Sequence, residues 1–141
     1  LFLARSGGGK STIAHMVADG REIFLLEDDE TVVARGTDGT VRCLPTHRIK
    51  MLTGVERIPP GALKNVFFVE KGSAPLVLPV PAKYAFYRAA RIGSFLGAQL
   101  LDPNEKHALL KGIQSILSGF PCFVVRYSPP VNPLDVMGDL L

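Results

Sequence analysis

The stretch Ala4-Arg5-Ser6-Gly7-Gly8-Gly9-Lys10-Ser11-Thr12 decides the fold that this sequence predicts. It fits the pattern in which Gly or Ala, four further residues and Gly-Lys-Ser/Thr join a strand to a helix. The apolar residues 1–3 precede it, and a helical run over residues 12–18, ended by Asp19-Gly20, follows it. Strand, loop and helix in this order predict a phosphate-binding loop.

The residue types in this loop suit the phosphates of a nucleotide. Consecutive glycines let the backbone turn its N–H groups inward around phosphate oxygens, and a helix N-terminus adds partial positive charge. We expect Lys10 to be exposed and to reach the β- and γ-phosphates, and the Ser11 hydroxyl to bind Mg²⁺. The residues predicted to hold the nucleotide are Ser6, Gly7, Gly8, Gly9, Lys10, Ser11 and Thr12. A flexible glycine-rich turn is the alternative.

Length and composition predict a single domain over residues 1–141. The chain has 47% hydrophobic residues, which is typical of a globular protein, and no apolar run approaches the ~20 residues that span a membrane. A net charge of +3 without a long basic block does not favour nucleic acid as a partner. Cys43 and Cys122, each inside an apolar run, are expected to be buried free thiols, which favours the cytoplasm. Because the loop begins at residue 4, we expect upstream strands or an N-terminal region to be missing.

Hydrophobic runs separated by turn residues predict an α/β domain, with a mixed β-sheet core and flanking helices. The expected strands are residues 1–3, 21–26, 31–35, 40–44, 65–70, 76–80 and 121–127. The expected helices begin near residues 12, 81, 94, 102 and 133, and residues 46–64 are predicted to form a loop.

Local signals predict several boundaries. Asp38-Gly39 between two β-branched runs is typical of a hairpin turn, and Pro45 is expected to stop the second strand. Asp102 is a suitable N-cap for a helix whose apolar positions recur at helical spacing, and Gly119 is a suitable C-cap.

An enzyme built on such a loop needs an acid beside the phosphates, to orient Mg²⁺ and to accept the proton of a phosphorylated hydroxyl. Asp28-Asp29 follows the predicted strand 21–26, so an open α/β sheet would bring the pair to the same carboxyl edge as the loop. Side chains of neighbouring strand residues point to opposite sides, so the two acids cannot play identical roles. A solvated acidic turn is the alternative.

The loop, the short helix and Leu26-x-Asp28-Asp29 together resemble the kinase core of the HPr kinase/phosphorylase family, which is related to ATP-dependent phosphoenolpyruvate carboxykinases. Residues 65–70 and 121–127 also resemble strands of HPr kinase-like proteins, some of which phosphorylate peptides or small metabolites. The resemblance implies a fold like the HPr kinase C-terminal domain, with ATP and Mg²⁺ as cofactors. It also implies that one of Asp28 and Asp29 is the general base and the other a metal ligand. We favour Asp28 as the base and Asp29 as the ligand.

The predicted activity is ATP-dependent, Mg²⁺-assisted transfer of a phosphoryl group to a hydroxyl, with Asp28 and Lys10 as catalytic residues. The acceptor, whether protein, peptide or small molecule, stays open, as does association of the chain into a homo-oligomer. Two other functions also stay open: a nucleotide-sensing module without a phosphoryl acceptor, and a simple ATPase.

Weaker candidates lie outside these motifs. His47 and Arg48 follow the hairpin, where they can position phosphate or form an exposed pair. His15 and His107 are expected to be ordinary surface or packing residues, and Arg126 to be an arginine at a strand end whose head group reaches water. Tyr84, Phe86 and Tyr87 are expected to be core or partner-facing residues rather than a platform for adenine.

Overall fold

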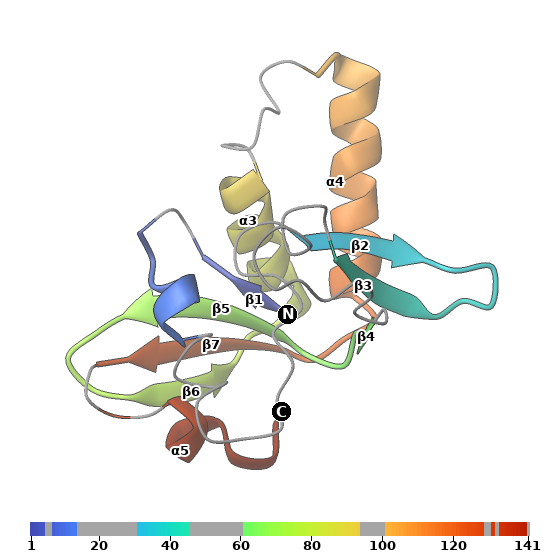
Figure 1. Cartoon of the computed structure of the whole chain (residues 1–141). Helices are drawn as coiled ribbons and strands as arrows, with labels where there is room; N and C mark the ends of the chain where they lie inside the picture. Colours follow the sequence, from blue (N-terminus) through green and yellow to red (C-terminus); the bar gives the residue numbers. More distant parts are fainter. Residues whose placement is uncertain are drawn as a thin grey trace.

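The computed structural model describes residues 1–4, 7–13, 31–45, 61–93, 101–128, 131 and 133–140. This part of the chain is a mixed α/β structure with two sheets (Figure 1), which confirms the predicted fold class at that level. The strand predicted over residues 21–26 and the helix predicted to begin near residue 94 lie outside the described residues.

The main sheet has four strands in the order β1-β5-β7-β6. Strands β1 (Phe2–Leu3), β5 (Val66–Lys71) and β7 (Cys122–Tyr127) are parallel, whereas β6 (Leu76–Pro79) pairs with β7 in the antiparallel direction. The carboxyl ends of the three parallel strands therefore meet at one edge of the sheet, which is where open α/β sheets bind their ligands.

Both faces of this sheet are covered. Successive side chains of a strand point to opposite faces, and β5 is buried on both sides, as is typical of parallel strands. One core cluster combines Val66 and Phe68 with residues of α3 (Ala82–Gly93), the end of α4 (Pro103–Leu117) and the smaller sheet. The other combines Phe67 and Val69 with Ile13 and with Met137 of α5 (Pro133–Met137). In Figure 1, α3 and α5 accordingly lie on opposite sides of the sheet.

The smaller sheet contains the predicted hairpin. Strands β2 (Thr31–Arg35) and β3 (Val41–Pro45) are antiparallel and joined by a turn in which Gly39 has φ +79°. Strand β3 ends at Pro45, as predicted, since a proline is tolerated at a strand end. One prediction was wrong here. The short β4 (Gly61–Ala62) lies within the predicted loop, where it pairs with β3.

The predicted capped helix is α4. The Asp102 carboxylate accepts hydrogen bonds from the backbone N–H groups of Asn104 and Glu105, and the Glu105 carboxylate accepts one from Asp102 N. The C-cap is Ser118 rather than Gly119, because the chain keeps a right-handed helical conformation through Ser118. The first two turns of α4 extend beyond α3 and are exposed (Figure 1). At the other end of the chain, the short 3-10 helix η1 (Gly138–Leu140) follows α5.

Cys43 and Cys122 are buried free thiols, as predicted. Burial raises the pKa of both thiols above the ordinary value, so the neutral form is favoured. No helix in the described ranges is long and apolar enough to cross a membrane.

Candidate functional site

The glycine-rich segment lies at the carboxyl end of β1. Gly7 and Gly9 have φ +70° and +93°, a left-handed conformation that favours glycine, and residues 10–13 follow in helical conformation. The first helical hydrogen bond runs from Ile13 N to Gly9 O at 2.9 Å. Ile13 is fully buried against the sheet, which fixes the start of this helix relative to β1. The segment thus combines left-handed glycines with a helix start, the backbone arrangement on which anion nests depend.

Tyr127, the last residue of β7, contacts this segment at Gly9. The residue is 1% exposed, and its hydroxyl donates a hydrogen bond to Gly9 O at 3.4 Å. A Cβ atom at Gly9 would lie 1.9 Å from the Tyr127 hydroxyl oxygen, so no other residue type fits there without movement. By contrast, a Cβ atom at Gly7 would meet nothing within 4 Å. At position 9, both the left-handed φ and the lack of space for a Cβ atom favour glycine, whereas at position 7 only the left-handed φ does.

Lys10 differs from the expectation of an exposed side chain. It is half-buried, and its Nζ donates a hydrogen bond to Ala4 O at 3.2 Å, which closes the segment across its two ends. The Ala4 carbonyl follows the last residue of β1, so the ammonium group is held at the carboxyl edge of the sheet. Ser11 and Thr12 are exposed in the first helical turn, and Gly8 is half-buried.

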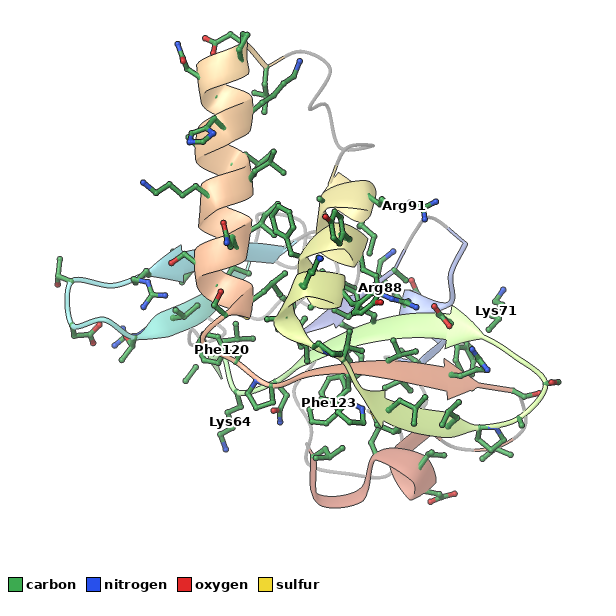
Figure 2. All side chains as sticks on the ribbon, turned by 180° about the vertical axis from the view of Figure 1, so that it is seen from behind. Lys64, Lys71, Arg88, Arg91, Phe120 and Phe123 are labelled. Carbon is green, nitrogen blue, oxygen red and sulfur yellow. The ribbon has the colours of Figure 1, made fainter. Side chains whose placement is uncertain are left out.

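A groove of about 880 Å³ extends from Gly8 to the face of α3 along the carboxyl edge of the sheet. Its volume falls within the range of about 300–1,000 Å³ that is usual for small-molecule sites. Figure 2 shows Lys71 at the end of β5, with Arg88 and Arg91 of α3 on the same side of the molecule. Among the described residues, four basic side chains and one acidic side chain line the groove: Lys71, Arg88, Arg91, Arg126 and Glu70.

Glu70 connects the two sides of this groove. One carboxylate oxygen accepts a hydrogen bond from Arg88 of α3, and the other accepts one from Arg126 of β7 at 3.5 Å. The hydrogen bond from Arg88 holds the pKa of Glu70 below its usual value, although partial burial acts in the opposite direction. Gly72 leaves room for the aliphatic part of Arg126, because a Cβ atom there would lie 2.1 Å from the Arg126 Cδ. Glu70 therefore fixes both guanidinium groups at the sheet edge.

The three aromatic residues of α3 lie in two environments. Phe86 packs against the core, whereas Tyr84 and Tyr87 are 65% and 56% exposed and line the groove. They lie three residues apart, so they share one face of the helix with Arg88 and Arg91. Sequence reasoning assigned neither the tyrosines nor the arginines to a site. Helical spacing of aromatic and basic residues was the available signal, but it does not say which element they face.

Several predicted site residues are not among those that the structure describes. Ser6, His15, Asp28, Asp29, His47 and Arg48 lie outside the described residues. His107 lies on the exposed part of α4, as expected for a surface residue. Within the described ranges, no three histidine, cysteine, aspartate or glutamate side chains come close enough to hold a metal ion. The predicted pairing of Ser11 with Asp29 at Mg²⁺ stays a prediction.

Comparison with known proteins adds no relative from which a family or an activity can be taken. No protein-family model matches this sequence, and searches of curated proteins and of solved structures found no significant match.

Proposed function

We propose that this chain binds Mg-ATP through the glycine-rich segment and transfers the γ-phosphoryl group to a hydroxyl, as in HPr kinase-like proteins. The observation that carries the proposal is the backbone of residues 7–13. Two left-handed glycines lead into a helix whose first residue is Lys10, at the carboxyl edge of a mainly parallel sheet. Backbone N–H groups at a helix start attract phosphate oxygens, and a lysine adds charge-assisted hydrogen bonds to them.

The residues at this edge have the chemistry that phosphotransfer needs. To bind phosphate oxygens, the ammonium group of Lys10 would leave the Ala4 carbonyl. The movement would be short, because the carbonyl and the proposed phosphate site both lie beside the glycine-rich segment. Ser11 is an exposed hydroxyl in the first helical turn and would be one ligand of Mg²⁺, which would neutralise phosphate charge. The acceptor oxygen forms a bond to the γ-phosphorus, and the bond to the β,γ-bridging oxygen breaks, so ADP leaves with that electron pair. The hydroxyl proton passes to a carboxylate, for which we propose Asp28, with Asp29 as the second metal ligand.

The experiment that tests this proposal separates binding from turnover. Asp28→Asn keeps the size of the side chain but removes the proton acceptor, so phosphotransfer should fall ~10²–10⁴-fold while Mg-ATP affinity changes little. Asp29→Asn should instead weaken the dependence on Mg²⁺, because a metal ligand loses its charge. Both variants are compared with the unaltered chain for Mg-ATP affinity and for turnover, with slow ATP hydrolysis as the fallback assay.

Each alternative has its own outcome in this experiment. A chain that binds Mg-ATP but turns it over with no acceptor and does not hydrolyse it supports a nucleotide sensor. Hydrolysis that depends on Asp28 and is not accelerated by any acceptor supports a simple ATPase. Turnover that is unaffected by Asp28→Asn contradicts the assignment of the base.

A further inference from the structure

We propose that the groove between the glycine-rich segment and α3 binds the phosphoryl acceptor, and that this acceptor is a small molecule with a carboxylate or phosphate group. This inference rests on the proposed function, because it assigns the molecule that would receive the phosphoryl group. It concerns residues that the nucleotide prediction did not include: Lys71, Tyr84, Tyr87, Arg88, Arg91 and Arg126.

The charge of the groove is the first argument for an anionic acceptor. Among the described residues that line the groove, Glu70 is the one acidic side chain, and it already accepts hydrogen bonds from Arg88 and Arg126. Within the described part of the chain, the ammonium group of Lys71 has no hydrogen-bond or ion-pair partner. No described acid therefore neutralises the charge of Lys71, and an anion bound here would reduce the repulsion between Lys71 and the guanidinium groups of Arg88 and Arg126.

The geometry of the arginines is the second argument. Arg88 comes from α3 and Arg126 from β7, and Glu70 between them restrains both side chains, which are 41% and 43% exposed. A guanidinium group held in this way loses less conformational entropy when it binds a carboxylate or phosphate, and it offers parallel N–H donors that match either group. Glu70 thus acts as a positioning residue for an anion site rather than as a competitor for it.

The position of the groove is the third argument. Gly8 forms part of its wall, so an acceptor bound there would lie beside the segment proposed to hold the γ-phosphate. Tyr84 and Tyr87 add exposed hydroxyl donors and ring faces for the uncharged part of the molecule. A volume of about 880 Å³ suits a small molecule, whereas a protein acceptor would require a surface of roughly 800 Å² on this chain.

The test uses two small anions that carry free hydroxyl groups: glycerate, with a carboxylate, and glycerol 3-phosphate, with a phosphate. Each is titrated by calorimetry into the whole chain saturated with the non-hydrolysable analogue Mg-AMP-PNP, and glycerol serves as the uncharged control. At least one anion should bind at millimolar concentration, and glycerol should not. The anion that binds more tightly identifies the acceptor group.

Matched variants locate the binding. Lys71→Gln and Arg91→Gln should each weaken anion binding about tenfold or more, as expected for the loss of a charge-assisted hydrogen bond. Lys64→Gln is the control, since Lys64 is an exposed lysine at the opposite end of β5 (Figure 2) and should change affinity less than twofold. Equal effects of Lys64→Gln and Lys71→Gln would overturn the proposal.

The remaining outcomes separate this proposal from the proposed function. If Mg-AMP-PNP binds and neither anion does, the acceptor groove is wrong and the nucleotide site stands. If an anion competes with Mg-AMP-PNP instead of binding beside it, the groove belongs to the nucleotide and the proposal is overturned. If Mg-AMP-PNP itself does not bind, the proposed function fails, and the acceptor assignment fails with it.

Discussion

The contact between Gly9 and Tyr127 gives a prediction whose size follows from the structure. Gly9→Ala places a methyl group 1.9 Å from the Tyr127 hydroxyl oxygen, 2.8 Å from Cζ and 3.0 Å from Cε1. Tyr127 is 1% exposed, so its ring cannot move into solvent without displacing its neighbours. The left-handed φ of Gly9 costs alanine about 1–2 kcal/mol, and overpacking adds about 1–3 kcal/mol. Gly9→Ala should therefore lower the free energy of unfolding by about 2–5 kcal/mol.

Gly7→Ala is the matched control because it isolates the backbone cost. Gly7 also has a left-handed φ, but its added Cβ would meet no heavy atom within 4 Å. It should lower the free energy of unfolding by only about 1–2 kcal/mol. Urea unfolding of both variants measures the difference, provided that the slopes of the transitions stay equal.

A double variant tests the identity of the clashing atom. Tyr127→Phe removes the nearest oxygen but keeps the ring carbons at 2.8 and 3.0 Å, so it should relieve only part of the effect of Gly9→Ala. The effects of the two substitutions on the free energy of unfolding should consequently be non-additive by about 0.5–3 kcal/mol, as expected for residues in contact. Equal destabilisation by Gly7→Ala and Gly9→Ala would refute this reasoning.

Three further predictions concern other parts of the fold. Glu70→Gln should lower the free energy of unfolding by about 1 kcal/mol or less at pH 7, because the ion pairs are partly exposed. The pKa of Glu70 is below its usual value of 4.5, so this contribution is present above that value and is lost as the pH falls through the lower folded-state pKa. Between pH 7 and pH 3, the difference in free energy of unfolding between Glu70→Gln and the unaltered chain should therefore become smaller. A constant difference would contradict the prediction. Asp102→Ala should cost about 0.5–2 kcal/mol in urea unfolding through the loss of two hydrogen bonds at the start of α4, and no change would mean that this helix end contributes nothing to stability. Cys43 and Cys122 should react slowly with a thiol reagent at pH 7 and rapidly in urea, because both are buried with raised pKa values; rapid reaction of the folded chain would contradict their burial.

Local elements of this fold could be predicted because their signals lie within a few residues of one another. Residues 66–69 and 122–125 are continuous apolar runs, and they form most of the two central strands β5 and β7. The hairpin turn at Asp38-Gly39 and the cap at Asp102 involve hydrogen bonds over two or three residues. The shorter β4 was missed because its two residues, Gly61 and Ala62, have no strand pattern of their own.

Contacts between distant segments could not be predicted in the same way. Tyr127 reaches Gly9 across 118 residues, and Arg126 reaches Glu70 across 56 residues. Both depend on the strand order β1-β5-β7-β6, which places segments from the beginning, middle and end of the chain side by side. The glycine-rich segment could be recognised from its residues. The contact of Tyr127 with Gly9 and the basic groove beside the segment could be identified only in the folded structure.

The most direct test of the proposed phosphate site is calorimetric titration of Mg-ATP into the unaltered chain and into Lys10→Ala, with Lys64→Ala as the control. The unaltered chain should bind one Mg-ATP, and Lys10→Ala should lose about 1.5–3 kcal/mol of binding free energy, roughly a 10- to 150-fold weaker affinity. Lys64→Ala should bind as tightly as the unaltered chain, because Lys64 lies at the opposite end of the sheet. Absence of binding by the folded, unaltered chain, or equal affinity of the Lys10→Ala variant, would contradict the account.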